Sequence, residues 1–220
     1  MARIRRRIVL AAAALALAAG PILSPIAWAG VPADAVNGDM SLGNPKAKVR
    51  VTEYASASCP HCAHFNAAIF PAFKAKYVDT GRVHYTLKEF LTPPNEAAAA
   101  GFLVARCAGR AKYFTVLDQV FKSQSQWTAG NIGQVISQVG VANGLSLEQV
   151  NSCLTDQAAL DALNARVSQA MEKDQINSTP TLVVNGKQVA VGTLADLDKA
   201  IAAASGAPAK PAAKKPGKRR

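Results

Sequence analysis

The sequence predicts an α/β fold in which one sheet is interrupted by an all-helical insertion. Three observations support this class: a strand–helix–strand pattern over 49–90, helical periods with almost no strand chemistry over 96–175, and a hairpin followed by a helix over 181–204. Strands that alternate with helices favour a sheet covered by helices, and a separate helical run favours an inserted block. The 220 residues, half of them hydrophobic, suffice for about one to one and a half domains.

The first unit is a strand, a helix and a second strand. Residues 49–55 are β-branched and partly alternating, as in a strand. A helix is expected over 59–77, because Pro60 falls in its first turn, where a missing N–H costs nothing. Pro71 lies inside this run and should kink it. Residues 83–90 alternate again and predict the second strand.

The elements that follow are helical until the chain returns to the sheet. Helices are expected over 96–107, 112–123, 132–141, 147–154 and 158–174, the fourth with a capping box that starts at Ser146. Asn185-Gly186 separates strands at 181–184 and 188–191, which is the strongest short signal for a hairpin. Thr193 can then cap a last helix over 194–204.

The charge distribution argues against nucleic-acid binding. The formal net charge is +11, but four arginines lie in 1–29 and six basic residues lie in 205–220, with no acid in either segment. Residues 30–204 hold 15 basic and 14 acidic residues, a net charge of +1. This body lacks a basic footprint, and aromatic residues, at 6%, are too few for a base-stacking surface. No nucleic-acid partner is expected.

The two ends differ from the body. Residues 1–29 combine an arginine-rich start, an apolar run and the small-x-small site Ala27-Trp28-Ala29, which is the layout of a secretory signal peptide. An uncleaved membrane anchor is the alternative. Residues 205–220 alternate proline, alanine and lysine and predict a solvated, disordered tail, with weak attachment to anionic lipid as the alternative. A periplasmic or exported protein is expected, in an environment that oxidises cysteines.

The motif that carries chemistry is Cys59-Pro60-His61-Cys62, where a strand passes into a helix. A Cys-x-x-Cys at such a junction is a redox signature. Free N–H groups and the positive end of the helix dipole lower the pKa of the Cys59 thiol, and a protonated His61 would add to this effect. A stabilised reduced form makes the disulfide a strong oxidant. Cys62 lies one turn further in and would resolve a mixed disulfide.

Other interpretations of this segment compete with the redox one. The two cysteines could ligate copper or zinc with His61 and His64, although such sites usually draw a second ligand pair from elsewhere. Haem attachment needs a histidine directly after the second cysteine, where Ala63 stands. A purely structural disulfide would be strained across a two-residue loop. No resident metal and no bound cofactor are expected.

A second signal is Thr179-Pro180, directly before the apolar strand at 181–184. Proline is tolerated at the first position of a strand. If the peptide bond between the two residues is cis, the chain turns sharply and could present backbone groups beside the cysteine pair.

With these two motifs in this order, the sequence resembles the secreted DsbA-like thiol:disulfide oxidoreductases of the thioredoxin superfamily, over about residues 40–204. The resemblance implies a thioredoxin-like fold with a helical insertion, and thiol–disulfide exchange without a cofactor. It implies Cys59 as the nucleophile, Cys62 as the resolving thiol and Pro180 as a cis-proline that faces them.

The resemblance also implies two supporting residues. Thr179 would bind substrate peptide through its backbone. Glu53, six residues before Cys59, matches an acid that such proteins place beneath the site to assist proton transfer. An ordinary strand carboxylate with a local partner is the alternative for Glu53, since a buried acid is only a probabilistic marker of a site.

The remaining cysteines, Cys107 and Cys153, lie in the helical block. Four cysteines allow three pairings, and a functional Cys-x-x-Cys needs its own partner, so a Cys107–Cys153 bridge is the consistent choice. Export favours this structural disulfide over two buried free thiols, which is the alternative. Some relatives are similar in having a second disulfide in their helical domain.

These predictions divide the chain into successive segments. They are a signal peptide (1–29), a lead (30–45), the first part of the thioredoxin-like domain (46–92), the helical insertion (93–175), the second part of that domain (176–204) and the basic tail (205–220). The lead is too short and polar for a clear dimerisation segment, which favours a monomer.

The predicted function is that of a dithiol oxidase. It would act on reduced exported proteins, and the resemblance implies a membrane quinone-linked thiol oxidase as its reoxidant. A disulfide isomerase or reductase of the same fold is the alternative within enzymes. A copper- or zinc-binding module and a peptide-binding holdase are the alternatives from other classes.

Overall fold

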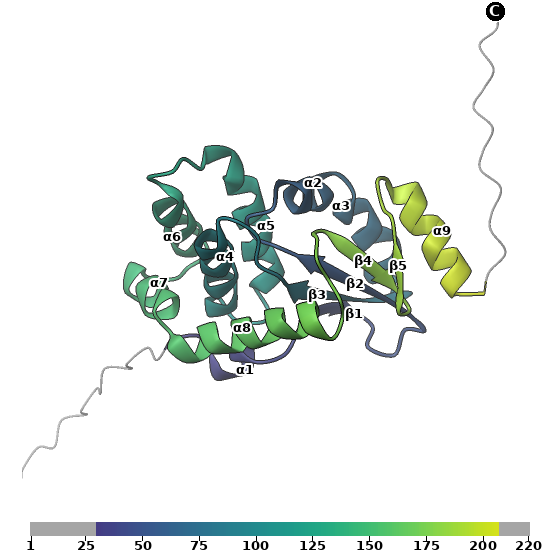
Figure 1. Ribbon diagram of the computed structural model, residues 1–220, viewed down its shortest axis with the longest axis horizontal. Helices are drawn as coiled ribbons and strands as arrows, with labels where there is room; N and C mark the ends of the chain where they lie inside the picture. The colour runs from purple at the N-terminus through teal and green to yellow at the C-terminus, as the bar shows by residue number, and fades with distance from the viewer. Residues whose placement is uncertain (1–29, 207–220) are drawn as a thin grey trace, which may run out of the picture.

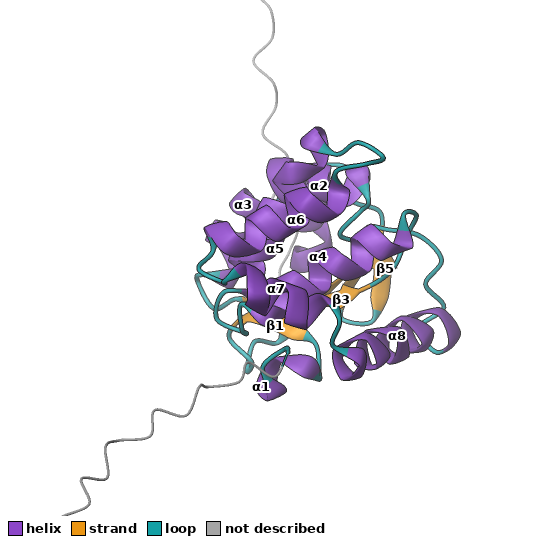
Figure 2. Ribbon diagram, turned by 90° about the vertical axis from the view of Figure 1, so that its left-hand side faces the viewer, coloured by secondary structure: helices purple, strands orange, loops and turns teal. Residues whose placement is uncertain are grey.

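A computed structural model describes residues 30–206 (Figure 1). The predicted signal peptide or anchor, and almost all of the predicted basic tail, lie outside this range. Within the range, no helix is both long and apolar enough to cross a membrane. The α/β class with a helical insertion is confirmed: a mixed sheet lies at one end of the molecule and a group of helices at the other (Figures 1 and 2).

The sheet of the described range has five strands in the order β1-β3-β2-β4-β5. The strands are β1 Met40–Gly43, β2 Val49–Ala55, β3 Val83–Glu89, β4 Thr181–Val184 and β5 Lys187–Val189. β2 and β3 are parallel, as a strand–helix–strand unit requires, and the other three pairs are antiparallel. The hairpin between β4 and β5 turns at Asn185 and Gly186, whose φ angles of 45° and 82° suit this tight reversal.

Two elements in the lead were not expected from the sequence. The short helix α1 (Ala33–Val36) precedes β1, which pairs antiparallel with β3 at the edge of the sheet. Only Met40 is buried in β1, so this strand has no apolar alternation for a sequence pattern to detect. The extended conformation of β1 therefore depends on its pairing with β3 and not on its own composition.

The single helix expected over 59–77 is divided in the structure. α2 (Pro60–Ala68) is followed by its C-cap residue Ile69, then by α3 (Phe70–Phe73) and by a π-helical turn over Lys74–Val78. The break falls beside Pro71, which has no N–H to donate to the preceding turn. The kink is thus confirmed, and the continuous helix is corrected to three short pieces.

The helical block consists of four helices at one end and a long return helix. They are α4 (Asn95–Cys107), α5 (Tyr113–Ser123) with a 3-10 turn at Gln124–Gln126, α6 (Ile132–Ala142), α7 (Leu147–Leu154) and α8 (Gln157–Glu172). The capping box of Ser146 and Gln149 is present at the start of α7. α8 runs back along β3 to the sheet, and α9 (Leu194–Ala204), capped by Thr193, packs on β4 and α3 (Figure 1). A disulfide joins Cys107 at the end of α4 to Cys153 in α7.

A buried ion network ties the sheet to the block and to α1. Glu89 at the end of β3 accepts hydrogen bonds from Arg106 Nε (2.7 Å), Tyr113 Oη (2.9 Å) and Arg166 Nη2 (2.7 Å). Arg106 also donates to the Ala35 carbonyl of α1. Arg106 and Glu89 are each 1% exposed, so their charges are compensated by one another and not by water.

α4 approaches the turn after β2 closely at Gly101. A Cβ at this position would lie 2.9 Å from both the Ala57 Cβ and the Val120 Cγ1. We therefore expect Gly101→Ala to lower the free energy of unfolding by about 1–3 kcal/mol in a urea titration, because the added methyl overpacks the contact. Gly133→Ala is the matched control: it has open space in α6 and should raise the stability by up to about 1 kcal/mol. Equal stabilisation by both variants would contradict the close contact.

Candidate active site

The Cys-Pro-His-Cys segment lies where β2 passes into α2. A turn closed by a hydrogen bond from Cys59 N to Ser56 O (3.0 Å) reverses the chain after β2. Cys59 is the N-cap residue of α2 and Pro60 its first residue, as expected. Both cysteines are free thiols; Cys59 is 7% exposed, whereas Cys62 in the next turn is fully buried. The pair is therefore asymmetric: one sulfur lies near solvent and the other inside the core.

The two thiols have opposite electrostatic environments. The pKa of Cys59 is lowered to about 5, chiefly by a hydrogen bond from the Cys62 thiol, with support from Thr179 and from the backbone N–H groups of Cys62 and His61. The pKa of Cys62 is raised, chiefly by burial and then by its hydrogen bond to Cys59 and the charge of Glu53. Cys59 therefore carries the thiolate at neutral pH, and Cys62 holds the proton. The His61 side chain is exposed, and its contribution comes through its backbone N–H.

The Thr179–Pro180 loop lies against Cys59. The peptide bond between these two residues is cis, and Cys59 Sγ lies 3.5 Å from the Thr179 carbonyl oxygen, a contact in which only the protonated form of Cys59 can donate. The next residue, Thr181, begins β4 opposite Tyr54 of β2, so pairing within the sheet sets the position of the loop. The segments around 59 and 179, which are 120 residues apart, thus form one site.

Glu53 lies within the sheet beneath the cysteine pair. It is 2% exposed, and its Oε2 accepts a hydrogen bond from Tyr85 Oη at 2.6 Å. Burial raises the pKa of Glu53 to about 7, the Tyr85 hydrogen bond opposes this shift, and the charge of Cys59 adds to it. The carboxyl can thus both hold and release a proton near neutral pH.

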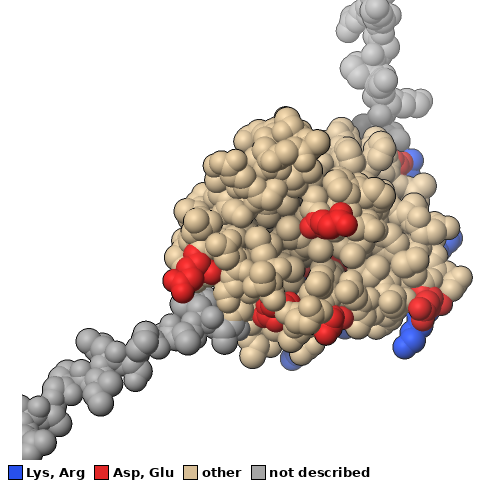
Figure 3. Space-filling model, turned by 60° about the vertical axis from the view of Figure 1, so that its left-hand side comes forward, with Lys and Arg blue, Asp and Glu red and all other residues tan. Residues whose placement is uncertain are grey.

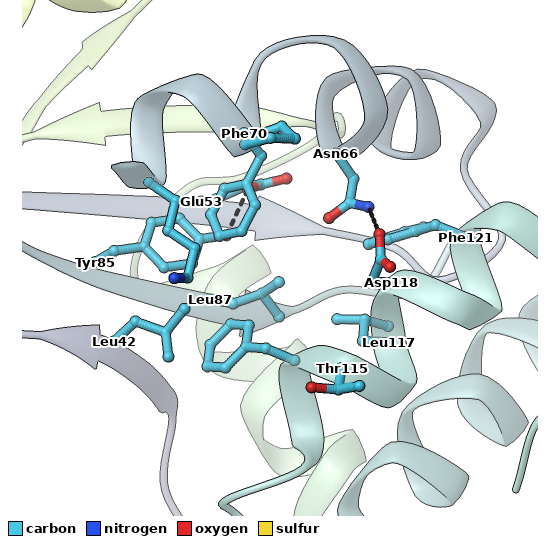
Figure 4. A pocket seen from close by; sticks show the side chains of 13 residues that line it. Leu42, Glu53, Asn66, Phe70, Tyr85, Leu87, Thr115, Leu117, Asp118 and Phe121 are labelled. Atoms are coloured by element: carbon cyan, nitrogen blue, oxygen red, sulfur yellow. Dashed lines mark hydrogen bonds between the residues drawn. The ribbon is translucent and has the colours of Figure 1, made fainter. Parts of the chain in front are cut away.

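Glu53 also lines a small cavity between the sheet, α2 and α5 (Figure 4). The cavity has a volume of about 230 Å³ and walls that are mostly apolar, including Phe70 and Leu117. A hydrogen bond from Asn66 to Asp118 (2.7 Å) links α2 to α5 beside it. Glu53 therefore meets this space from the side of the sheet.

A side chain of the helical block bonds directly to the backbone that carries Cys59. Gln124, just after α5, donates from Nε2 to the carbonyls of Ala57 (2.9 Å) and Cys59 (3.4 Å). These bonds fix the backbone on which Cys59 is carried. The block is thus part of the framework of the site.

The site has polar members that sequence reasoning missed. Tyr85 is one, and Ser56, Ser58, Thr92 and Gln124 are others. Tyr85 could have been found from the register of two parallel strands with inward-facing positions, because Tyr85 pairs with Val51, two residues from Glu53. The other four act through side chains in turns and loops, where no periodic pattern marks them.

The metal-module alternative has no ligand set in this structure. Among residues 30–206, no three His, Cys, Asp or Glu side chains gather closely enough to hold a metal ion. His61 and His64 are both exposed on α2, whereas Cys62 is buried. On the face drawn in Figure 3, acidic side chains lie apart from one another and no group of basic side chains forms a patch.

Known proteins with similar sequences match this chain over most of its length. A family model described as thioredoxin matches residues 35–203. A Rickettsia typhi protein provisionally named a protein-disulfide oxidoreductase is 32% identical over 167 residues, which are 75% of this chain and 61% of that protein. The disulfide bond formation protein D of Bacillus subtilis is 25% identical over 179 residues, 76% of this chain and 78% of its own length. This chain spans only 54% to 64% of the five Rickettsia relatives.

The fold has solved counterparts. The crystal structure of Wolbachia pipientis alpha-DsbA1 is similar with a TM-score of 0.71 and 26% identity, and the match covers 77% of this chain and 92% of that one. BdbD from Bacillus subtilis has a TM-score of 0.66 at 18% identity, which supports the fold alone. The family model shows that the chain belongs to the thioredoxin family, and its fold is similar to that of a DsbA protein.

Proposed function

We propose that the protein is a dithiol oxidase, which introduces disulfides into other proteins through the Cys59–Cys62 pair. The observation that carries the proposal is the pKa of Cys59, about 5, beside a Cys62 whose pKa is raised. A thiol that ionises so readily stabilises the reduced form of the pair. The oxidised form, the Cys59–Cys62 disulfide, is therefore a strong oxidant of other thiols. The buried neighbour keeps its proton and leaves Cys59 as the reactive sulfur.

The proposed reaction transfers two electrons from substrate to enzyme. A substrate thiolate attacks Cys59 Sγ; the Cys59–Cys62 bond breaks, and Cys62 leaves as a thiolate that takes up a proton, with Glu53 as the nearby acid. A second thiolate of the same substrate then attacks the substrate sulfur of the mixed disulfide. The bond from that sulfur to Cys59 breaks, and Cys59 leaves as a stabilised thiolate. The products are a substrate disulfide and the enzyme dithiol seen in the structure.

The proposed substrates and reoxidant are those that the family resemblance implies. The backbone of Thr179, beside Pro180 and in contact with Cys59, would bind the substrate chain as a short extended segment. Reduced exported proteins are the proposed substrates. A membrane thiol oxidase linked to quinone is the proposed reoxidant, and the periplasm or cell exterior the proposed location, which the signal-like residues 1–29 support.

Oxidative refolding tests this proposal. Catalytic amounts of the protein are added to reduced, unfolded ribonuclease A in a glutathione buffer, and recovered ribonuclease activity is followed. We expect faster recovery with the wild type, no acceleration with Cys59→Ser, and a trapped mixed disulfide at Cys59 in Cys62→Ser. The Cys59→Ser/Cys62→Ser double variant sets the background rate.

The reduction potential separates an oxidase from a reductase. Equilibration with glutathione, read by mass spectrometry after alkylation, should give a potential above about −180 mV, which is more oxidising than protein disulfide isomerase. A potential near about −270 mV, as in thioredoxin, would contradict the oxidase and favour a reductase. Full activity of Cys59→Ser would overturn the assigned nucleophile.

A further inference from the structure

Three hydroxyl groups form a hydroxyl ring behind the cysteine pair: those of Ser56, Ser58 and Thr92. Ser56 Oγ accepts from Thr92 Oγ1 (2.9 Å) and from Thr92 N (3.2 Å). Ser58 Oγ donates to the Thr92 carbonyl (2.8 Å) and lies 3.2 Å from Ser56 Oγ. Ser58 Oγ also lies 3.2 Å from Thr92 Oγ1, so the three hydroxyl groups close a ring of hydrogen-bond contacts.

The hydroxyl ring connects two segments that are distant in sequence. Ser56 and Ser58 belong to the turn between β2 and α2, and are 0% and 6% exposed. Thr92 lies 36 residues later, in the loop after β3. The ring thus holds the turn against this loop.

The turn carries a hydrogen bond to the buried sulfur. The backbone N–H of Ser56 donates to Cys62 Sγ at 3.5 Å, within the core. A hydrogen bond of this kind stabilises a negative charge on sulfur and lowers the pKa of Cys62, against the burial that raises it. The same residue therefore supplies the N–H to Cys62 through its backbone and the central hydroxyl of the ring through its side chain.

We propose that the Ser56 N–H stabilises the negative charge on Cys62 as it leaves during disulfide transfer, and that Ser58 and Thr92 are positioning residues that hold this N–H in place. The inference rests on the proposed thiol–disulfide exchange. In that step the attacking thiolate forms a bond to Cys59 Sγ, and the electron pair of the broken Cys59–Cys62 bond moves to Cys62 Sγ before a proton arrives. In the reverse step, reoxidation, Cys62 attacks as a thiolate and needs the same donor. The disulfide and the protonated Cys62 thiol both carry no charge on this sulfur, so, measured from either of them, a preorganised donor at the site of developing charge lowers the barrier.

The test is a comparison of three threonine variants. Thr92→Val removes the hydroxyl and keeps the shape of the side chain, so the bond from Thr92 Oγ1 to Ser56 Oγ is lost while the bond from the Thr92 backbone N–H remains. Thr92→Ser keeps the hydroxyl and should restore the wild-type behaviour. Thr86→Val is the matched control, because Thr86 on β3 also bonds a serine hydroxyl (Ser41, 3.0 Å) but does so in an exposed contact outside the hydroxyl ring. Ser56→Ala is a second variant that disrupts the hydroxyl ring: it keeps the Ser56 N–H and removes the hydroxyl that bonds both Ser58 and Thr92.

Two measurements are made on each folded variant. Reduced glutathione is the attacking thiol, and its rate of reaction with the oxidised pair is measured by acid quench, alkylation and mass spectrometry. Hydrogen exchange of the Ser56 amide in the reduced protein is measured by NMR. We expect Thr92→Val and Ser56→Ala to slow the reaction about tenfold, the effect of one lost hydrogen bond in the transition state, and to exchange the Ser56 amide about tenfold faster. Thr92→Ser and Thr86→Val should match the wild type in both measurements.

The pKa of Cys59 separates this role from a general loosening of the site. It should stay at its wild-type value in Thr92→Val, since the hydroxyl ring makes no contact with Cys59 Sγ in the hydrogen bonds of residues 30–206. A wild-type reaction rate in Thr92→Val, or a slower rate with an unchanged Ser56 amide, would overturn the inference and leave the proposed function intact. A wild-type protein whose pair does not react with glutathione would instead overturn the proposed function.

Discussion

Iodoacetamide should alkylate Cys59 of the reduced protein with a pH profile whose midpoint lies near 5. An ordinary thiol with a pKa of 9.0 would react fully only in alkaline solution, so the profile is expected to shift by about four pH units. The measurement is the alkylation rate between pH 3 and 9, with peptide mass spectrometry to assign the modified residue. Cys62 should stay unmodified across this range, because it is buried and its pKa is raised.

The Cys62→Ala variant is the control for the cause of this shift. It removes the thiol that supplies the largest stabilising hydrogen bond to Cys59, so the midpoint should rise toward the ordinary value. A wild-type midpoint near 9 would contradict the assigned thiolate, and the oxidase would lose its main support.

The same shift makes the stability of the reduced protein depend on pH. The folded state has the lower pKa of Cys59, so it binds fewer protons at this group than the unfolded state between pH 5 and pH 9. The stabilisation is therefore fully present above pH 9, weakens as the pH falls, and is lost as the pH passes through about 5. Urea titrations of the reduced wild type and of reduced Cys59→Ser should diverge as the pH rises through this window.

Glu89→Ala should lower the free energy of unfolding by about 3–5 kcal/mol, which is the cost of leaving buried charges without a partner. The variant leaves Arg106, which is 1% exposed, and Arg166 without their shared carboxylate. Urea titration followed by circular dichroism measures the change. Asp79→Ala is the control, because it breaks the exposed Lys74–Asp79 pair and should change the stability by less than about 1 kcal/mol. A loss in Glu89→Ala no larger than in the control would show that the network is not a main support of the fold.

The fold was largely predictable because apolar residues recur with the period of a strand or of a helix in its main elements. Residues 49–55 form β2 without any change in their bounds, and the Asn185-Gly186 hairpin lies where its turn residues predict. β1 was not predictable, since one buried residue in four leaves no alternation. The helix expected over 59–77 was too long. The sequence shows that Pro71 disturbs the helix, but whether the helix bends or breaks there depends on how the neighbouring residues pack.

The cysteine motif was predictable from spacing, whereas its polar surroundings were not. Cys59, Cys62 and Pro180 are marked by short motifs, Cys-Pro-His-Cys and Thr-Pro before an apolar strand, which can be read from the order of neighbouring residues alone. The partners of Glu53 and Glu89 come from other strands and helices, and become neighbours only when the sheet and the block pack together. The hydroxyl ring unites positions 56 and 92 in the same way. Contacts between distant polar groups carry no periodic signal, so tertiary structure has to supply them.

The bridge between Cys107 and Cys153 has a practical meaning for any titration of this molecule. Its two half-cystines are 2% and 0% exposed, whereas Cys59 is 7% exposed. When the oxidised protein is treated with a mild reductant in native buffer, only the Cys59–Cys62 disulfide should thus be reduced, with two electrons per chain, and denaturant should raise the uptake to four electrons. A redox titration of the folded protein would therefore detect one dithiol–disulfide pair, even though the four cysteines of the chain can form two.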